Sequence, residues 1–324
     1  MSFTILVTAP VLAPAGQAVL DRAGCRTLFV TKKGGAGQLS DILARESVDG
    51  VISRTLPMTA EMIGSCRTLK VISRHGTGFN NVDVAAATKH RIPVLVASGT
   101  NSQSVAELTI GLMIAAARNV VELDDGIRGG EWPRSSAGVE LAGKTLGLVA
   151  YGAVARKVER MAASIGMRVM VFDPYLPSGA DVARAGTLEE LFAASDVISL
   201  HCPLNGETEN MIGSAALGAM KRGVIIINTA RGGLIDEAAL AGSIRSGHVR
   251  AAGLDTLAEE PPARDHPLMN LRQVVLTPHM GGSTDAALAN TAKLAANNAL
   301  TVLAGKIPNP SFLINPQVLE EHPL

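Results

Sequence analysis

Three short stretches in the second half of the chain carry side chains that could hold an anion and move a proton. Arg231 lies in A-R-G-G (230–233), Glu260 directly precedes Pro261, and His279 lies in T-P-H-M-G-G (277–282). A guanidinium binds a carboxylate through two parallel hydrogen bonds, and histidine and glutamate are common acid–base groups. Taken singly, an arginine in a turn is as often a surface side chain as a ligand, a histidine is more often structural than catalytic, and a glutamate is usually solvated, so the residues alone leave both interpretations open.

Each stretch follows an apolar segment that is typical of a buried strand, at residues 223–228, 251–254 and 274–276. In doubly wound sheets, ligands bind beyond the carboxyl ends of parallel strands. The three side chains therefore stand where such a sheet would place a ligand site.

A dinucleotide-binding pattern spans residues 147–173. It predicts a strand at 145–150, the turn Ala150-x-Gly152-x-x-Ala155, a helix ended by Gly166, and a strand at 168–172 before Asp173. A strand, a glycine turn, a helix, a strand and an acid form the βαβ unit that binds dinucleotides.

Each position in this pattern has a physical task. Gly152 lets the backbone approach a pyrophosphate, and the helix N-terminus offers N–H groups and a positive dipole end. Asp173 would accept hydrogen bonds from the adenosine ribose and repel a 2′-phosphate, which favours NAD over NADP. Alanine at 150 and 155 degrades the glycine fingerprint, so an ordinary βαβ unit with a glycine turn is the alternative.

Composition narrows the class of protein. The chain has 324 residues, a formal net charge of zero and few aromatic residues, which favours two domains and argues against nucleic-acid and membrane-surface partners. Three scattered cysteines fit neither a disulfide framework nor a zinc site, so we expect no metal and a cytoplasmic location. Prolines interrupt the uncharged first twenty residues, which do not resemble a signal peptide or membrane span.

Strand and helix patterns alternate along most of the chain, and this alternation predicts two doubly wound α/β domains with parallel sheets. Residues 1–100 lack a glycine-rich turn after their first strand. We expect residues 1–100 and 288–324 to form a smaller, substrate-binding domain, into which a larger Rossmann-type NAD domain (101–287) is inserted. Two chain crossings would put the ligand site at the domain interface.

The sequence resembles the D-isomer-specific 2-hydroxyacid dehydrogenases, closest to the phosphoglycerate dehydrogenase-like branch. The resemblance rests on A-R-G-G-L-I-D-E (230–237), the E-E-P segment and T-P-H-x-G-G-S-T, together with R-H-G-T-G-F-N-N-V-D (74–83) and N-S-Q-S-V-A-E-L (101–108). It implies an NAD-dependent enzyme that interconverts a 2-oxo acid and a D-2-hydroxy acid.

The resemblance also implies roles for individual residues. Arg231 would anchor the substrate, His279 would be the acid–base group, and Glu260 would orient His279. The implied substrate contacts are Arg74, Gly76, Thr77, Gly78, Arg231 and His279. The implied cofactor contacts are Ala150, Gly152, Ala153, Val154, Asp173, Cys202, Thr229, Ala230, Asp255, Gly281 and Gly282.

Several alternatives stay open at this point. Ala150, Ala153 and Ala155 depart from the family pattern and bear on NAD affinity, and Asn80 replaces a usual aspartate and bears on substrate identity. The substrate could be of the 3-phosphoglycerate/phosphohydroxypyruvate class or the hydroxypyruvate/glyoxylate class, with Arg54 and Arg74 as candidate phosphate or carboxylate contacts. An NAD(H)-sensing corepressor of the same fold is the alternative function, and formate dehydrogenase is disfavoured by Glu260.

A homodimer is expected through residues 119–141, a polar, glycine-rich excursion that holds the only tryptophan of the chain, Trp132. An ordinary surface loop is the alternative interpretation of this segment.

Overall fold

The computed structural model describes residues 2–134, 137–177 and 179–320, and it divides into two compact units. Unit 1 comprises Met1–Asn101 and Ser283–Leu324, and unit 2 comprises Ser102–Gly282. We predicted divisions after residues 100 and 287. The second division comes earlier because helix α11 (Asp285–Leu303) buries its alanine-rich side, including Ala292, Ala295 and Ala296, in a core of unit 1.

Unit 1 is built on a five-stranded parallel sheet in the order β2-β1-β3-β4-β5. Its strands are short and mostly apolar, and all except the edge strand β2 are largely buried, as expected for strands covered on both faces. Their bounds are Thr4–Val7 (β1), Arg26–Phe29 (β2), Gly50–Ser53 (β3), Val71–Arg74 (β4) and Val94–Val96 (β5).

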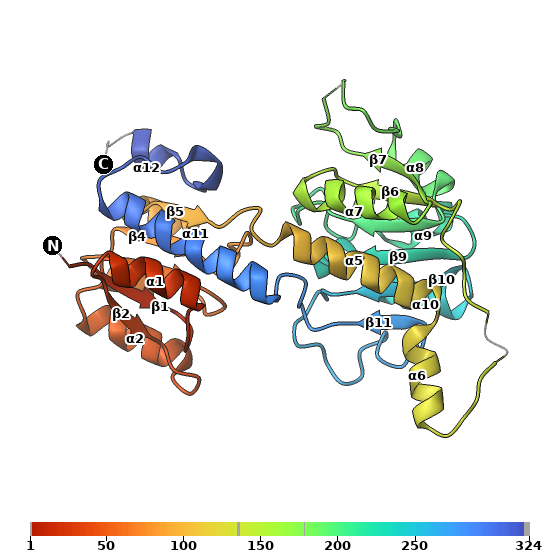
Figure 1. Cartoon of the computed structure of the whole chain (residues 1–324), viewed down its shortest axis with the longest axis horizontal. Helices are drawn as coiled ribbons and strands as arrows, with labels where there is room; N and C mark the ends of the chain where they lie inside the picture. Colours follow the sequence, from red (N-terminus) through yellow and green to blue (C-terminus); the bar gives the residue numbers. More distant parts are fainter. Residues whose placement is uncertain (1, 135–136, 178, 321–324) are drawn as a thin grey trace. The chain divides into compact units, whose positions relative to one another are not determined.

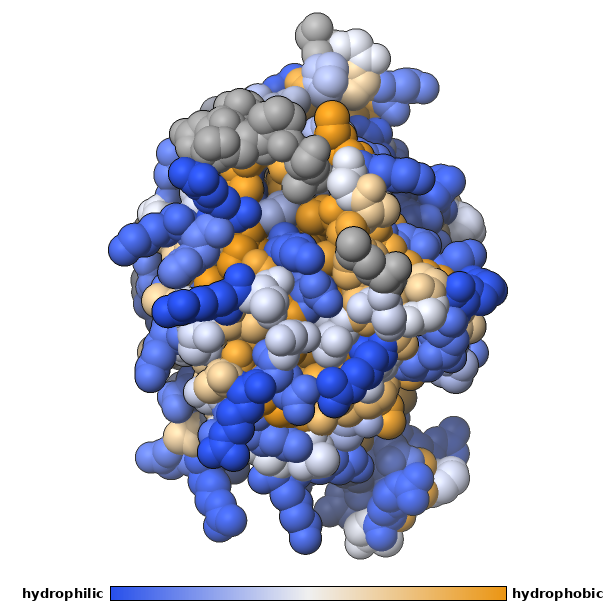
Figure 2. All heavy atoms as spheres, turned by 90° about the vertical axis from the view of Figure 1, so that its left-hand side faces the viewer, coloured by the Kyte–Doolittle hydropathy of each residue, from blue (hydrophilic) through white to orange (hydrophobic). Residues whose placement is uncertain are grey.

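Helices cover both faces of this sheet. Helix α1 (Pro14–Arg22) and α11 lie side by side on one face, although they are far apart in sequence (Figure 1). The other face packs against α2 (Gly35–Arg45), α3 (Ala60–Ser65) and α4 (Val84–Lys89). The chain ends with η2 (Pro310–Phe312) and α12 (Gln317–Glu320). In the face shown in Figure 2, hydrophilic side chains cover most of the area, and hydrophobic ones are visible in small areas between them.

Unit 2 contains a six-stranded parallel sheet in the order β11-β10-β9-β8-β6-β7. The strands are Thr145–Val149 (β6), Arg168–Phe172 (β7), Val197–Leu200 (β8), Val224–Asn228 (β9), Val249–Leu254 (β10) and Val274–Leu276 (β11). The strand order reverses direction between β6 and β8, so the carboxyl end of β6 lies at the topological switch point where such sheets bind nucleotides.

Two helical layers cover the sheet of unit 2. Helices α5 (Ser102–Ala117) and α7 (Ala153–Ser164) pack on one face, and α8 (Leu188–Ala194), α9 (Ser214–Ala219) and α10 (Glu237–Arg245) on the other. Helix α6 (Val120–Arg128) buries none of its residues and extends away from the sheet in Figure 1. Among the described helices, none is by itself long and apolar enough to cross a bilayer, although α5 and α6, bent by 63°, meet the criteria as a pair.

The predicted fold class is confirmed: both units are doubly wound and wholly parallel. The short helices α3, α6, α8 and α9 were not predicted. Two of them carry recognisable start signals, because Thr59 caps α3 and Thr187 caps α8 through their side-chain oxygens. Their apolar patterns are too short to reveal a helical period.

Candidate active site

His279 lies in the loop between β11 and α11, in a backbone conformation that is unusual for its residue type. Its φ is 55°, in the left-handed region that costs a residue with a side chain about 1–2 kcal/mol. Its N–H donates to the carbonyl oxygens of Asp255 (2.8 Å) and Thr277 (3.0 Å). Strained backbone of this kind persists only where the surroundings over-determine it.

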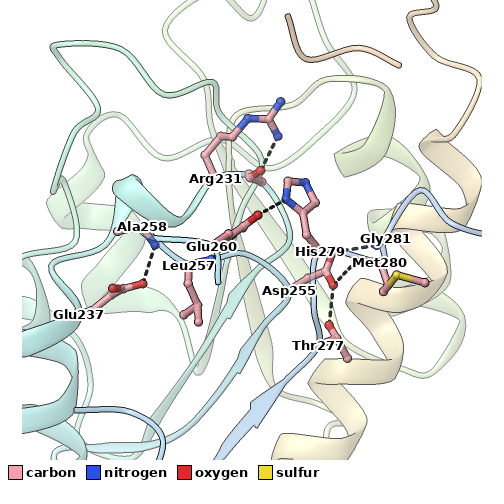
Figure 3. Close-up of polar contacts among 11 residues, drawn as sticks. Arg231, Glu237, Asp255, Leu257, Ala258, Glu260, Thr277, His279, Met280 and Gly281 are labelled. Atoms are coloured by element: carbon pink, nitrogen blue, oxygen red, sulfur yellow. Dashed lines mark hydrogen bonds and ion pairs between the residues drawn. The ribbon is translucent and has the colours of Figure 1, made fainter. Parts of the chain in front are cut away.

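The buried carboxylate of Asp255 supplies that constraint (Figure 3). Its Oδ1 accepts hydrogen bonds from the Thr277 hydroxyl and from Met280 N–H (2.8 Å), and its Oδ2 accepts from Gly281 N–H (2.8 Å). Only 2% of Asp255 is exposed. We predicted Asp255 as a cofactor contact. The structure uses its carboxylate to hold the turn that carries His279, and the cofactor contact stays a prediction.

Glu260 contacts the His279 ring directly. Its Oε2 lies 2.8 Å from His279 Nδ1, and its Oε1 accepts from Leu257 N–H at 3.1 Å. The carboxylate therefore faces Nδ1 and leaves Nε2 directed elsewhere. Both side chains are open to solvent, with 48% of His279 and 40% of Glu260 exposed. Such a pair can exchange a proton with a bound molecule.

Arg231 lies on the neighbouring loop, just beyond the carboxyl end of β9. Figure 3 shows its side chain and the His279 ring extending in the same direction from adjacent loops. Buried Asn228 shapes the Arg231 turn, because its side-chain amide donates to Arg231 O (2.8 Å) and its amide oxygen accepts from Ala230 N–H (3.0 Å). The structure thus brings Arg231, Glu260 and His279 to one edge of the sheet, as predicted from their strand ends.

The turn after β6 fits a dinucleotide. A Cβ built on Gly152 would meet nothing within 4 Å, so a ligand can approach the backbone there, and no side chain caps the N-terminus of α7. Asp173 lies beside the turn and accepts from Tyr151 N–H (2.8 Å) and Tyr175 N–H (2.9 Å). A carboxylate has about four acceptor sites, so Asp173 retains capacity for ribose hydroxyls.

Ala150 takes the conformation that glycine usually supplies. Its φ is 70°, and its N–H donates to Phe172 O at 2.8 Å.

The next residue, Tyr151, connects the turn to α7. Its hydroxyl donates to Glu159, and Arg156 lies over its ring at 4.2 Å. Burial, and then the Glu159 carboxylate, raise the pKa of Tyr151 to about 12, so the hydroxyl keeps its proton. Ala153 is exposed, and buried Ala155 packs in the core as expected for the third fingerprint position.

Cys202 follows β8, beyond the same sheet edge, but its thiol packs against the protein. Its Sγ lies 3.7 Å from Met211 Sδ, and burial raises the pKa of the thiol to about 11, which keeps it protonated at neutral pH. The preceding His201 was not predicted. Its Nε2 lies 3.0 Å from the Ser199 hydroxyl, and burial lowers the pKa of His201 to about 4.

The remaining predicted cofactor residues of unit 2 follow the ends of β6, β9 and β11. The Thr229 hydroxyl shares a hydrogen bond with that of Thr109 on α5. Gly281 is buried, and a Cβ there would lie 3.0 Å from Asp255 Oδ2. Three further predicted contacts also lie beyond these strand ends: Val154, Ala230 and Gly282.

Unit 1 presents the loop after β4, which we predicted to bind substrate. Arg74 donates from Nη1 to the carbonyls of Ser53 (2.9 Å) and His75 (3.3 Å), so its guanidinium holds the loop. Gly76 has a φ of 143°, a conformation that favours glycine. Thr77 is exposed and Gly78 half-buried. Substrate contacts by these residues stay predictions.

A second cationic group lies beside this loop. Arg54, directly after β3, is half-buried, and within the described ranges no carboxylate forms an ion pair with it. Burial lowers the pKa of the Arg54 guanidinium. Burial, and then the Arg54 charge, lower the pKa of neighbouring His75 to about 4, so this imidazole is neutral at neutral pH.

Comparison with known proteins assigns the family. Residues 110–281 match the family model of the D-isomer specific 2-hydroxyacid dehydrogenase, NAD binding domain. The chain is 41% identical over 262 residues to a D-3-phosphoglycerate dehydrogenase of Methanocaldococcus jannaschii, covering 79% of this chain and 50% of that protein. It is 42% identical over 237 residues to a hydroxypyruvate reductase of Thermotoga maritima, covering 72% of this chain and 78% of that protein. The TT0316 protein of Thermus thermophilus has the same fold, with a TM-score of 0.89 and 34% identity over 96% of this chain and all of that one.

The chain belongs to the D-isomer specific 2-hydroxyacid dehydrogenase family. The predicted resemblance is confirmed, and unit 2 is the NAD-binding domain of this family member. The corepressor alternative has no support among these relatives, which are named as dehydrogenases and reductases. The chain spans about half the length of the phosphoglycerate dehydrogenase it matches.

Three residues that build this dehydrogenase-family site were missed in the sequence. Asn228 was treated as the last residue of a strand, Thr277 as part of the histidine motif, and Glu237 as the end of the arginine motif. A polar residue at the end of an apolar strand is a usable signal, because a buried amide such as Asn228 needs hydrogen-bond partners. No local pattern marks the longer-range hydrogen bonds, which join the Thr277 hydroxyl to Asp255 and Ala258 N–H to the Glu237 carboxylate.

The left-handed backbone at Ala150 yields a stability prediction. Ala150→Gly removes the strain of a Cβ at a φ of 70°, so we expect it to stabilise the protein by about 0.5–1 kcal/mol. Ala153→Gly, three residues later in the first turn of α7, is the matched control and should destabilise it, because glycine weakens a helix. Thermal unfolding followed by circular dichroism measures both. A midpoint for Ala150→Gly at or below that of the parent would contradict the argument.

Proposed function

We propose that this protein is an NAD-dependent oxidoreductase that interconverts a 2-oxo acid and a D-2-hydroxy acid. The observation that carries the proposal is the 2.8 Å contact between Glu260 and His279, beside Arg231, at the carboxyl edge of an NAD-binding sheet. This edge is where doubly wound folds bind their ligands. The family membership and the named activities of the relatives support the same reaction class.

His279 is the proposed acid–base group. Because Nδ1 faces the Glu260 carboxylate, Nε2 is the atom that gives a proton to the C2 oxygen of a 2-oxo acid during reduction and takes it back during oxidation. Glu260 holds the ring in this orientation and stabilises the imidazolium that forms when Nε2 takes a proton. Bound NADH would supply the hydride to C2 during reduction, and bound NAD+ would accept it during oxidation.

Arg231 is the proposed anchor of the substrate carboxylate. Its Nη1 donates to the carbonyl of Ala230 at 2.6 Å, which fixes the guanidinium and leaves Nε and Nη2 for a ligand. A planar fork of this kind matches a carboxylate and places positive charge near the oxygen that becomes negative in the transition state. Asp173 favours NAD over NADP, because a 2′-phosphate would meet its carboxylate at the end of β7.

We assign recognition of a phosphate on the substrate to unit 1. Arg54 is a half-buried cation without a carboxylate partner in the described ranges, and the neighbouring His75 is neutral, so an anionic group bound there would pair with an otherwise uncompensated positive charge. Asn81 fixes the Arg54 segment, since its amide donates to Arg54 O (2.9 Å) and Leu56 O (2.8 Å). These features favour phosphohydroxypyruvate over unphosphorylated hydroxypyruvate or glyoxylate.

We also propose that a second copy of the chain covers the exposed apolar side of α6. Val120, Val121 and Ile127 are 48%, 42% and 52% exposed, and Trp132 beyond the helix is 74% exposed. Such a cluster is unusual on a monomer surface and suits a self-complementary contact. Residues 135 and 136 of the predicted dimer segment lie outside the described residues.

The acid–base assignment is tested with His279→Asn, since asparagine tolerates a left-handed backbone but cannot transfer the proton. We expect kcat for 2-oxo acid reduction, followed as NADH oxidation at 340 nm, to fall by roughly 10²–10⁴. His248→Asn is the matched control, because His248 precedes β10 at the opposite edge of the same sheet and bonds Leu217 O. A His279→Asn enzyme within threefold of the parent would refute the role.

The substrate assignment is tested with Arg54→Met, which removes the charge and keeps the length. Losing a charge-assisted hydrogen bond should lower kcat/KM for phosphohydroxypyruvate by roughly 10- to 100-fold. The value for hydroxypyruvate should change less than about threefold. Lys70→Met is the control. It removes an exposed positive charge directly before β4, at the opposite end of the strand from Arg74. Equal losses for the two substrates in Arg54→Met would contradict the assignment.

The dimer is tested by analytical ultracentrifugation at micromolar concentration. We expect the parent to sediment as a dimer and Ile127→Asp to shift it to a monomer, because burying an unpaired charge is costly. Ile307→Asp, at a still more exposed apolar residue of unit 1, should leave the dimer intact. A monomeric parent would contradict the proposed dimer. A result in which Ile307→Asp is a monomer and Ile127→Asp stays a dimer would contradict α6 as the contact.

A further inference from the structure

A second carboxylate–imidazole pair lies beneath the loop that carries Glu260. Glu237, the first residue of α10, has its Oε2 at 2.9 Å from His266 Nε2. Leu268 N–H donates to His266 Nδ1 at 3.4 Å, so Nε2 carries the proton that faces Glu237. Only 12% of the Glu237 side chain and 14% of the His266 side chain are exposed. This pair is enclosed by protein, in contrast to the open Glu260–His279 pair.

Glu237 also holds the near end of the same loop. Its Oε1 accepts from Ala258 N–H at 2.9 Å, as Figure 3 shows, while His266 stands at the far end. One carboxylate therefore ties together two points that flank Glu260 in the sequence. Arg245, at the end of α10, adds a hydrogen bond to Pro267 O at 3.1 Å. Helix α10 thus fixes the base of the loop.

The backbone of the loop that carries Arg231 packs directly against the loop that carries Glu260. A Cβ on Gly232 would lie 1.8 Å from the carbonyl carbon of Leu257 and 2.2 Å from the nitrogen of Ala258, so only glycine permits the contact. Segment 257–258 is therefore held both by Gly232 and by the Glu237 carboxylate. Because Leu257 N–H in turn donates to Glu260, a shift of this segment moves the carboxylate that contacts His279.

We propose that Glu237, paired with His266, is a positioning residue for the reaction: it sets the place of Glu260 and, through Glu260, the orientation of His279. The inference rests on the proposed function. It gives the stretch 230–237 two tasks, the substrate anchor Arg231 at one end and the support of the acid–base pair at the other. Displacements of about 1 Å in such supports can cost 10²-fold in rate.

The test is a set of variants with a matched control. Glu237→Ala should lower kcat by about tenfold or more while KM for the 2-oxo acid changes less than about threefold, because Arg231 keeps its own supports. Glu190→Ala is the control: Glu190 also lies in the first turn of a helix, α8, and accepts a backbone hydrogen bond, from Gly186 N–H. It should leave kcat unchanged.

A double-mutant cycle with Glu260→Gln separates positioning from general stability. If Glu237 acts through Glu260, adding Glu237→Ala to Glu260→Gln should change kcat less than about threefold, since residues linked through one hydrogen-bonded segment, here 257–258, couple. The same tenfold loss in both backgrounds would overturn the proposal, as would a Glu237→Ala enzyme with parental kcat. Should Glu237→Ala not fold, Glu237→Gln serves the same cycle: it keeps an acceptor for Ala258 but opposes His266 Nε2–H with an amide N–H.

Hydrogen exchange supplies a readout that needs no activity. The amides of residues 257–260 and 263–266, which leave out the two prolines of the loop, should exchange at least about tenfold faster in Glu237→Ala than in Glu190→Ala, because local opening becomes easier. Equal exchange would overturn the anchoring role. A parent protein that oxidises no NADH with any 2-oxo acid would refute the proposed function instead, and the exchange experiment would still decide whether Glu237 holds the loop.

Discussion

The buried carboxylate of Asp255 is the constraint on which the site depends. A left-handed histidine is unfavourable by itself, and the turn at 277–281 has no regular structure to stabilise it. Three donors from that turn converge on the Asp255 side chain, and His279 N–H bonds the Asp255 carbonyl. Hydrogen bonds to a buried charge are among the stronger ones in proteins, about 1.5–3 kcal/mol each. Together they outweigh the backbone strain and fix the histidine.

Much of this arrangement follows from strand ends that the sequence reveals. Arg231, Asp255 and His279 each follow an apolar strand, and strands β9, β10 and β11 are neighbours in the sheet. Parallel neighbours end at one edge, so the three residues had to come together once the strands were identified. That the Asp255 side chain also holds the His279 turn was not predicted, because a sequence shows which edge a carboxylate reaches but not which donors surround it.

Other features could not be predicted, because they depend on contacts between segments that are distant in the chain. The close approach of Gly232 to Leu257 requires the register of β9 against β10, and the Glu237–His266 pair spans a loop whose path no pattern specifies. The division of the chain was predicted more closely. Most of helix α11 was assigned to unit 1, where the structure has it, and only the second boundary, set after residue 287 rather than 282, cut off the first turn of the helix.

The two glutamate–histidine pairs differ in solvent exposure, and this difference matches their roles, one in proton transfer and the other in holding a loop. A pair that exchanges protons with a ligand must be reached by it, and exposed pairs contribute little to stability because water screens them. Glu260–His279 is of this kind. A pair that holds a loop benefits from enclosure, since a buried carboxylate left without its partners carries a large desolvation cost. Glu237–His266 meets that requirement, with each Glu237 oxygen bonded to one end of the loop. Glu260–His279 can therefore remain open to substrate while the enclosed Glu237–His266 pair holds the loop that carries Glu260.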